Sequence, residues 1–349
     1  MLEGSKNMAT MKEIAQKAGV SRGTVDRVLN NRGSVNPDTE RNIREIAKAL
    51  NYSPNFAGKT LAVRKKKLKF GYILFGSIDS NSFFEDVVFG IKNRAAELSD
   101  FGVTVEICEA SIDDPEQQAK RIDDMMELGI NGLAITPINH PIVADKLRKL
   151  SESGIPVVTS NSDIPDCGRL AYVGSNYYKS GETAAGLMNL ITGGVANVGI
   201  ISGSPHVLCH SERIAGFRDC AKAKFPGLKI IANAINHDND TESTKVTNDM
   251  LVKHTEIDAL FLTAAGVAGA CSAVCDLGLN GKLSIVSYDA TESTCRLIRD
   301  GVISATIAQQ PITQGALPLD ILLDYLCMGV HPEKELNYTE IEIKIKESL

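Results

Sequence analysis

The sequence lacks a long hydrophobic run. Although 43% of its 349 residues are hydrophobic, no window reaches the roughly 18 apolar residues that a membrane-spanning helix needs. The first ten residues, MLEGSKNMAT, contain no apolar stretch of the secretory kind. We therefore expect a cytoplasmic protein without a membrane partner. Because Met8 is an equally good first residue, we expect residues 1–7 to be a dispensable leader.

Paired cysteines are also missing. The eight cysteines are scattered without any CxxC spacing, which favours reduced thiols over a disulfide framework. His206, Cys209 and His210 lie close together, but no further cysteine or histidine stands at ligand spacing to complete a four-ligand site. We interpret this segment as a loop with incidental histidines, and we expect no metal.

Phosphate-loop and nucleophile motifs are absent as well. The glycine-rich stretch GGVANVGIISGSP has neither the GxGxxG spacing nor GK[ST], so a nucleotide site is not expected. There is no GxSxG elbow, and nothing in the sequence indicates a cysteine paired with an oriented histidine. The sequence therefore predicts neither catalytic residues nor a cofactor.

Charge is distributed unevenly along a chain whose formal net charge is -6. Residues 8–67 contain 13 Lys and Arg against 5 Asp and Glu, a net charge of +8. Residues 68–349 contain 23 against 37, a net charge of -14. A basic segment on an acidic body suggests a polyanionic partner, although a run of charge alone is as often a solvated face.

Three short amphipathic helices are expected in the basic segment. A capping box of Thr10 and Glu13 begins the first helix, and Gly19 ends it. Ser21 is a good N-cap for the second, and Asn36 followed by proline begins the third. Apolar residues three and four positions apart should form one small core: Ile14, Ala15, Ala18, Val25, Val28, Leu29, Ile43, Ile46, Ala47 and Leu50.

Two helices joined by a tight glycine turn form a helix-turn-helix, whose second helix enters the major groove of DNA. At the start of that helix, Arg22 can donate two hydrogen bonds to a guanine edge, whereas Ser21 and Thr24 suit phosphates. Gly23 lies between them, and Arg27 follows on the same exposed face. The alternative is a three-helix domain with solvated arginines, which explains the capping, the turn and the charge less well.

The segments KEIAQKAGVSRGTVDRVLN and TERNIREIAKALNYSPN resemble the DNA-binding head of the LacI/GalR family of bacterial repressors. The resemblance implies a DNA contact by Asn30 and a hinge in SPNFAGKTLA that becomes helical on an operator. In that hinge, Asn55 and Lys59 would contact DNA and Leu61 would be wedged into the minor groove. Asp26 stands where the family usually has a serine, so the operator sequence does not transfer.

From residue 68 onward the chain alternates short apolar runs with amphipathic helical patterns. The runs are KFGYILF, VTVEIC, GLAIT, IPVVT, NVGIIS, DALFLT, LSIVSYD and SATIAQ. This alternation is typical of parallel α/β sheets. Eight or more strands over about 280 residues favour two doubly wound halves, with a ligand cleft beyond the carboxyl ends of the strands.

Residues 68 to about 346 resemble periplasmic sugar-binding proteins of the ribose-binding type, whose architecture the effector domains of the LacI/GalR family share. The resemblance implies ligand contacts by seven residues: Asn81, Phe83 and Phe84 in NSFF, Asn161 after VVTS, Arg213 in SERIAGF, Asp289 after IVSY, and Gln309 in ATIAQQP. Other interpretations remain open. One of the two phenylalanines could belong to the core instead of the cleft, and Gln309 could serve only the strand crossover. Arg213 and Asp289 could also pair with each other across the cleft.

Two departures from the sugar-binding pattern concern the choice of ligand. Asn161 and Ser162 stand where relatives often carry an Asp-Arg pair, and Ala264 and Ala265 replace a polar pair. A cleft with fewer charged hydrogen-bonding groups suits a different polyol, a less polar sugar or a ligand of another kind.

Together these observations predict a small all-α helix-turn-helix domain (residues 8–52), a hinge helix with a basic linker (53–67), and an α/β periplasmic-binding-protein-like domain of two doubly wound halves for effector binding and dimerisation (68–349). The predicted function is that of a homodimeric, ligand-responsive transcription regulator, with a repressor as the preferred interpretation. It would bind a pseudo-palindromic double-stranded DNA operator and a small sugar-like effector. The alternatives are the solute-binding protein of a sugar transporter, which should have an export signal and no basic head, and a carbohydrate enzyme.

Overall fold

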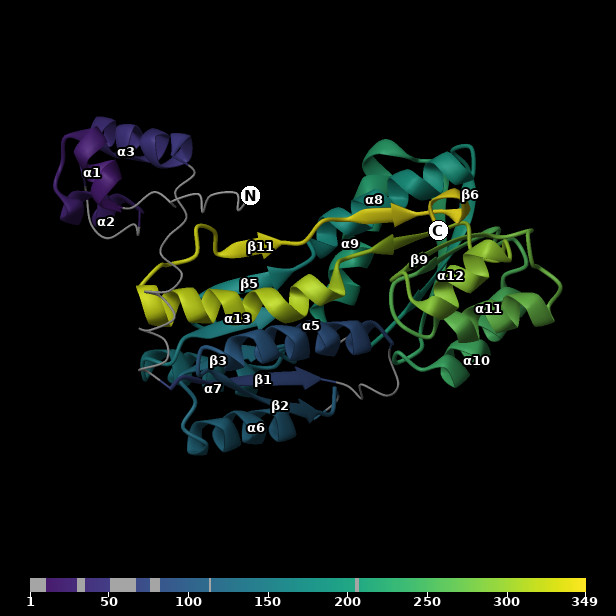
Figure 1. Cartoon of the computed structure of the whole chain (residues 1–349). Helices are drawn as coiled ribbons and strands as arrows, with labels where there is room; N and C mark the ends of the chain where they lie inside the picture. The colour runs from purple at the N-terminus through teal and green to yellow at the C-terminus, as the bar shows by residue number, and fades with distance from the viewer. Residues whose placement is uncertain (1–10, 30–34, 51–66, 76–81, 113, 205–206) are drawn as a thin grey trace, which may run out of the picture.

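The computed structural model describes residues 11–29, 35–50, 67–75, 82–112, 114–204 and 207–349. Within these ranges a three-helix unit is followed by two α/β lobes (Figure 1). No helix in the described ranges is both long and apolar enough to cross a lipid bilayer.

The N-terminal unit has the three expected helices: α1 (Met11–Ala18), α2 (Arg22–Leu29) and α3 (Pro37–Ala49). Gly19 ends α1 with a φ of 67°, a value that glycine adopts without strain. The Thr24 N–H donates to Ser21 Oγ at 3.1 Å, and the Asp38 N–H donates to Asn36 Oδ1 at 2.9 Å. Both expected caps of α2 and α3 are therefore confirmed, and all ten expected apolar residues form or cover the core of this unit.

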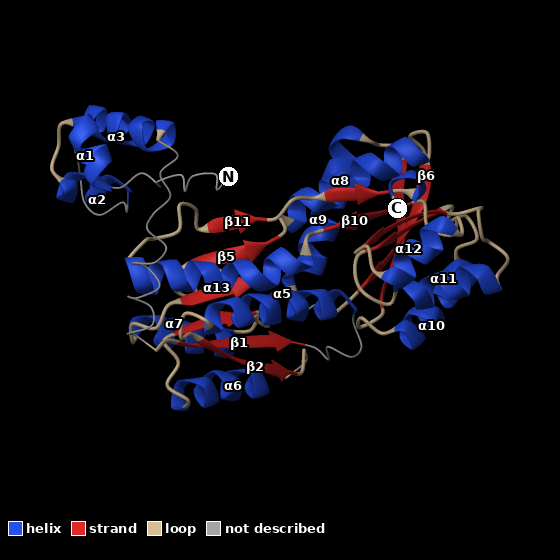
Figure 2. Ribbon diagram, in the orientation of Figure 1, coloured by secondary structure: helices blue, strands red, loops and turns tan. Residues whose placement is uncertain are grey.

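The first lobe is a six-stranded parallel sheet with the strand order β11-β5-β4-β3-β1-β2 (Figure 2). Helices α5 and α13 pack together on one face, and α6 and α7 pack together on the other. The strands are β1 (Lys69–Phe75), β2 (Thr104–Ala110), β3 (Gly132–Ile135), β4 (Val157–Ser160), β5 (Ala171–Gly174) and β11 (Leu336–Tyr338), and the helices are α5 (Ser82–Ser99), α6 (Pro115–Glu127), α7 (Pro141–Glu152) and α13 (Pro311–Met328).

The second lobe has the strand order β12-β10-β9-β8-β6-β7, in which only the pairing of β12 with β10 is antiparallel. One hydrophobic core lies under α8 and α9, and another lies under α10, α11 and α12. The elements are α8 (Tyr177–Ile191), β6 (Ala196–Ser202), α9 (Leu208–Lys224), β7 (Leu228–Ile235), α10 (Asp240–Lys253), β8 (Ala259–Leu262), α11 (Val267–Asp276), β9 (Ser284–Tyr288), α12 (Glu292–Arg299), β10 (Ala305–Ala308) and β12 (Glu342–Lys344), with a short 3-10 turn at Lys346–Ser348.

The predicted fold class is confirmed, and all eight apolar runs are strands. Four strands escaped the sequence analysis: β5, β7, β11 and β12. β5, β11 and β12 have only three or four residues, and β7 is an edge strand whose residues are mostly half-buried or exposed. β7, β11 and β12 lack the sustained apolar run that identifies a buried strand, whereas β5 (AYVG) is fully buried and its short apolar run was overlooked.

The chain passes between the lobes three times, from β5 to α8, from β10 to α13 and from β11 to β12 (Figure 1). The buried side chain of Gln314 links two of these crossovers, those after β10 and β11, to the loop after β4. Its Nε2 donates to the Gln309 carbonyl at 2.6 Å and to Thr339 Oγ1 at 3.5 Å, and its Oε1 accepts from Asn161 Nδ2 at 3.0 Å. One amide thus fixes the spacing of segments from both lobes.

A proline inside α13 leaves the backbone carbonyl of Gln314 without its usual partner in the helix. Pro318 has no N–H to donate to the Gln314 carbonyl one turn earlier, so this buried oxygen needs another partner. The hydroxyls of Tyr72 and Ser160 donate to it at 3.1 and 2.8 Å. Two strands of the first lobe therefore hold α13 in place by side-chain hydrogen bonds.

Helices α8 and α9 approach each other closely through two glycines. A Cβ added at Gly181 would collide with the backbone carbonyl of Arg213, and one added at Gly216 would collide with that of Tyr178. The absence of side chains at these two positions therefore fixes the position of α9 and of Arg213 on it.

Replacing Gly181 by alanine should destabilise the protein, because the new methyl group meets backbone that cannot move without separating α8 from α9. We expect a loss of about 1–3 kcal/mol in the free energy of unfolding, as for other overpacked sites, measured by urea denaturation. Gly186→Ala is the matched control in the same helix, since a Cβ there meets open space. It should leave stability unchanged or raise it by up to about 1 kcal/mol. Equal effects of the two variants would contradict this account of the helix contact.

Candidate functional site

A cavity of about 360 Å³ lies between the two lobes. The first lobe contributes Phe83 and Phe84 at the start of α5 and Asn161 after β4. The second lobe contributes residues that follow β7, β8, β9 and β10, residues from the first two turns of α9 and residues at the start of α10. Six of the seven expected ligand contacts line this cavity: Phe83, Phe84, Asn161, Arg213, Asp289 and Gln309. The seventh, Asn81, lies outside the described residues.

Phe83 and Phe84 serve both the core and the cavity. Both are buried in the hydrophobic core of the first lobe, and both line the cavity. Their rings meet edge to face, with centroids 5.3 Å apart and an interplanar angle of 87°. This T-shaped packing holds each ring against the other. Because both residues are in the core and also line the cavity, neither belongs to the core alone.

Arg213 is buried in the second lobe with only 3% of its surface exposed. Its guanidinium carbon lies 3.7 Å from the centroid of the Tyr288 ring and 4.9 Å from that of Tyr177. Its Nη1 donates to the Thr263 carbonyl at 2.6 Å. Cation–π contacts and a hydrogen bond to a carbonyl together fix the orientation of this cation at the cavity wall.

Asp289 follows β9 in a left-handed conformation with a φ of 66°. Its Oδ1 accepts a hydrogen bond of 2.7 Å from Gln309 Nε2, so the amide in the crossover orients the carboxylate. Burial raises the pKa of Asp289, although Arg213 and the Gln309 hydrogen bond oppose the shift. Among the described residues no ion pair joins Arg213 to Asp289, and each remains a separate feature of the cavity wall.

The side-chain amide and the backbone carbonyl of Asn161 both make hydrogen bonds within the protein. Its Nδ2 donates to Gln314, and its carbonyl accepts from the hydroxyls of Tyr172, at 3.1 Å, and of Tyr177. The φ of 62° at Asn161 turns the chain after β4 so that these contacts form. Next to it, the buried Ser162 hydroxyl has no hydrogen-bond partner.

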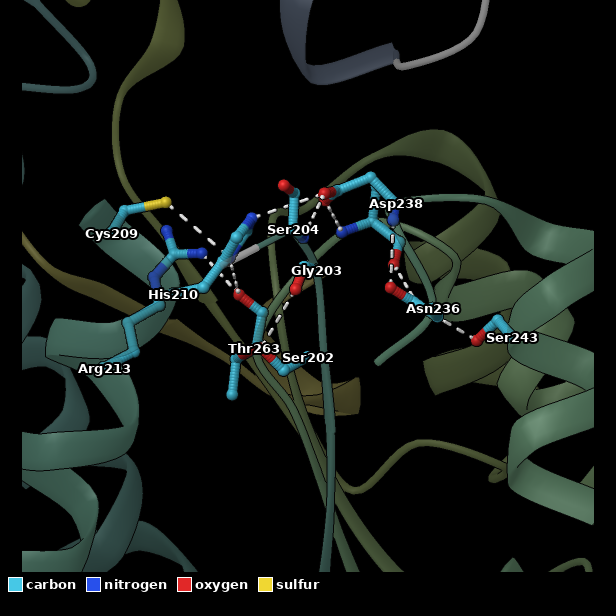
Figure 3. Close-up of polar contacts among 11 residues, drawn as sticks. Ser202, Gly203, Ser204, Cys209, His210, Arg213, Asn236, Asp238, Ser243 and Thr263 are labelled. Atoms are coloured by element: carbon cyan, nitrogen blue, oxygen red, sulfur yellow. Dashed lines mark hydrogen bonds and ion pairs between the residues drawn. The ribbon is translucent and has the colours of Figure 1, made fainter. Parts of the chain in front are cut away.

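His210 and Asp238 are cavity residues that the sequence analysis missed. The interpretation of a loop with incidental histidines was wrong for His210, which lies buried in the first turn of α9. Its Nε2 lies 3.4 Å from Asp238 Oδ2, and its Nδ1 lies 3.2 Å from the Thr263 carbonyl (Figure 3). The pair joins residues 28 positions apart, so no short motif could have indicated it. His206 lies outside the described residues.

The surroundings of the pair favour its charged form. Burial opposes the protonated form of His210, but the nearby Cys209 and the Asp238 carboxylate outweigh it and raise the pKa of His210 to about 10. Burial likewise opposes ionisation of Asp238, but the His210 imidazolium and two backbone N–H donors lower the pKa of its carboxyl. The part of the chain that the structure describes contains no cluster of three His, Cys, Asp or Glu side chains arranged to hold a metal.

The stability of the folded protein should therefore depend on pH through His210. A pKa raised from 6.5 to about 10 gives a stabilisation that is complete below the unfolded value and is lost as pH rises through the folded value. Urea denaturation of the wild type and of His210→Gln should show their difference in unfolding free energy shrinking by about 1 kcal/mol per pH unit above about pH 6.5. A difference that stays constant up to about pH 9 would contradict the raised pKa.

The start of α2 forms the second candidate site. Arg22, Gly23 and Arg27 are exposed there, and Arg27 Nε donates to the Gly23 carbonyl at 3.3 Å. The hydroxyls of Ser21 and Thr24 lie 2.9 Å apart, which closes the first turn. The remaining expected DNA contacts, Asn30, Asn55, Lys59 and Leu61, lie outside the described residues.

Comparison with family models assigns both parts of the chain. Residues 72–329 match the model described as periplasmic binding protein domain, and residues 10–55 match the model described as bacterial regulatory proteins, lacI family.

The known proteins that are similar to this chain include both a repressor and sugar-binding proteins. The ribose operon repressor of Halalkalibacterium halodurans is 27% identical over 330 residues, which are 90% of each chain. The ribose import binding protein RbsB of Bacillus subtilis is 27% identical over 274 residues, which are 78% of this chain and 86% of RbsB. A solute-binding protein of Burkholderia graminis, solved in complex with D-arabinose, has a TM-score of 0.74 and 25% identity, and the match covers 80% of this chain and 96% of that one.

Proposed function

The chain belongs to the periplasmic binding protein domain family and carries at residues 10–55 the helix-turn-helix of the lacI family, and on that premise we propose that it is a sugar-responsive transcription repressor. The observation that carries this proposal is the combination of a basic helix-turn-helix with a polar cavity between two α/β lobes in one chain. A repressor similar to this chain over 90% of both lengths supports the same combination.

The head supplies the chemistry for binding DNA. The positive end of α2 and the exposed Arg22 and Arg27 suit a phosphate backbone and a guanine edge in the major groove. The net charge of +8 on residues 8–67 would attract the polyanion, and the binding should weaken as salt increases.

The cavity supplies the chemistry for binding a sugar. Asp289 can accept hydrogen bonds from hydroxyls and Arg213 can donate to them, while the paired rings of Phe83 and Phe84 offer an apolar face. A volume of about 360 Å³ lies in the range of small-molecule sites. Two relatives are named for ribose and a structural neighbour holds D-arabinose, which supports a monosaccharide as the effector class.

The finer parts of the proposal concern assembly and location. One recognition helix reads only a half-site, so a homodimer on a pseudo-palindromic operator is proposed, acting in the cytoplasm. Residues 8–52 would form the DNA-binding domain, 53–67 the hinge, and 68–349 the effector-binding and dimerisation domain. Asn30, Asn55, Lys59 and Leu61 would add DNA contacts, and Asn81 would add a ligand contact.

The two rival functions have less support. A transporter's solute-binding protein shares the two lobes but gives no role to the head with its exposed arginines. A carbohydrate enzyme would need catalytic groups, whereas the proteins similar to this chain are named as regulators and binding proteins.

The DNA-binding half of the proposal is tested by selecting genomic fragments on the immobilised full-length protein and measuring the affinity of the best fragment at fixed salt. Arg22→Ala should weaken that affinity about tenfold or more, since a bidentate contact to guanine contributes about 1–3 kcal/mol. Arg218→Ala, which removes the same charge from an exposed position on α9, is the control and should bind as the wild type does. Unchanged affinity of the Arg22 variant would remove this residue from the interface.

The sugar-binding half is tested by thermal unfolding against pentoses, hexoses and polyols, because a ligand of the folded state raises the midpoint. Asp289→Asn should weaken binding of the active compound about tenfold or more and abolish its effect on DNA affinity, since a hydrogen bond to a charged group contributes about 1.5–3 kcal/mol. Asp300→Asn, at the exposed end of α12, should respond as the wild type does. A normal response of the Asp289 variant would exclude this carboxylate from ligand binding.

A further inference from the structure

The ring of His210 is surrounded by acceptors on both sides. Its Nδ1 faces the Thr263 carbonyl at 3.2 Å, and its Nε2 faces Asp238 Oδ2 at 3.4 Å (Figure 3). A carbonyl and a carboxylate carry no hydrogen, and a neutral imidazole has only one N–H to offer. Both nitrogens can donate at once only when His210 is an imidazolium; a neutral ring could donate to Asp238 only if Nδ1 accepted instead from the Cys209 thiol, 3.6 Å away.

Asp238 connects the strand ends that form the cavity wall. Its Oδ2 accepts from the Ser204 N–H and its Oδ1 accepts from the Ala265 N–H, each at 3.2 Å. Ser204 follows β6, Asp238 follows β7 and Ala265 follows β8. With His210 from α9, this carboxylate joins four neighbouring elements of the second lobe.

The Thr263 carbonyl is shared between two cations. Arg213 Nη1 donates to it at 2.6 Å, on the same oxygen that His210 Nδ1 approaches. Two like charges on one acceptor repel each other, and the Asp238 carboxylate on the far side of the imidazolium compensates for this repulsion. The position of the Arg213 guanidinium therefore depends on a carboxylate that it does not touch.

We propose that His210 and Asp238 are a charged positioning pair, which determines where the Arg213 guanidinium is presented to the ligand and hence which ligands the cavity accepts. Both ring nitrogens and both carboxylate oxygens contact protein groups, so the proposal gives the pair a positioning role, although both residues line the cavity. The part that concerns ligand choice rests on the proposed sugar-binding function, whereas the charged state of the pair does not.

The other titratable groups around His210 lie on α9 and after β9. Cys209 Sγ lies 3.6 Å from Nδ1, and Arg213 and Asp289 act from farther away. Removing the Asp238 carboxylate leaves Arg213 as the charged group that shares an acceptor with His210, so the imidazole of the variant should lose its proton far more easily.

The first test uses the ligand-free, full-length protein and NMR of histidine side chains, with His210 assigned from His210→Gln. The wild-type imidazole should remain protonated at both nitrogens from about pH 6 to about pH 8, whereas Asp238→Asn should bring its titration into or below that range. Glu242→Gln is the matched control, because it removes the carboxylate partner of the exposed His237, 3.0 Å away, and leaves His210 untouched. Deprotonation of wild-type His210 near the ordinary pKa of histidine would by itself overturn the proposal.

The same samples report on Arg213, whose side-chain signals can be assigned with Arg213→Lys. Asp238→Asn should shift these signals and make them depend on pH together with His210, and Glu242→Gln should shift neither. Arg213 signals that stay unchanged in Asp238→Asn while His210 titrates would separate the two residues and refute the positioning role.

Ligand choice is tested with D-ribose by calorimetry at about pH 6 and about pH 8. The affinity should be the same at both values in the wild type and in Asp300→Asn, which removes an exposed carboxylate at the end of α12. It should differ about tenfold between the two pH values in Asp238→Asn, as for loss of a hydrogen bond to a charged group. A flat profile in Asp238→Asn would contradict the proposal. If the wild type does not bind D-ribose, the sugar assignment is weakened, and the two NMR measurements still decide whether the pair is charged and positions Arg213.

Discussion

The contacts around the cavity in the second lobe depend on the burial of one cation, the guanidinium of Arg213. Placing the Arg213 cation inside a protein is costly unless it is compensated by acceptors, aromatic faces and nearby opposite charge. The Thr263 carbonyl, the Tyr288 ring and the Asp289 carboxylate supply this compensation from the carboxyl ends of β8 and β9. The glycine contact between α8 and α9 brings the arginine close enough to reach them. The packing of α8 on α9 and the electrostatics of the cavity are therefore parts of one arrangement.

Much of the fold was predictable because burial imposes simple periodicities. The caps at Ser21 and Asn36 and the apolar stripes of the head are local patterns, and the eight apolar runs identify seven internal strands and the edge strand β2. The short strands β11 and β12 depend on partners that lie far away in sequence, so they carry no local pattern. The placement of Phe83, Arg213 and Asp289 at one cavity followed from the resemblance to sugar-binding proteins and not from periodicity.

His210 and Asp238 show what neither periodicity nor resemblance could supply. Each is unremarkable in its own segment, and their pairing depends on how β6, β7 and β8 end side by side. Asn161 illustrates the opposite case. Its position at the cavity followed from the resemblance, but the commitment of its amide to Gln314 depends on where α13 crosses back into the first lobe.

The three crossovers have a mechanical consequence. Gln314 holds the 309–310 crossover at a fixed spacing from Thr339 and Asn161, and Gln310 adds a hydrogen bond of 3.2 Å from the Glu340 N–H. Two of the three links are thus braced against each other and against the first lobe, which opposes twisting and sliding of the lobes. We therefore expect the lobes to move mainly by a change of the angle between them, and a molecule in the cavity would act on that angle.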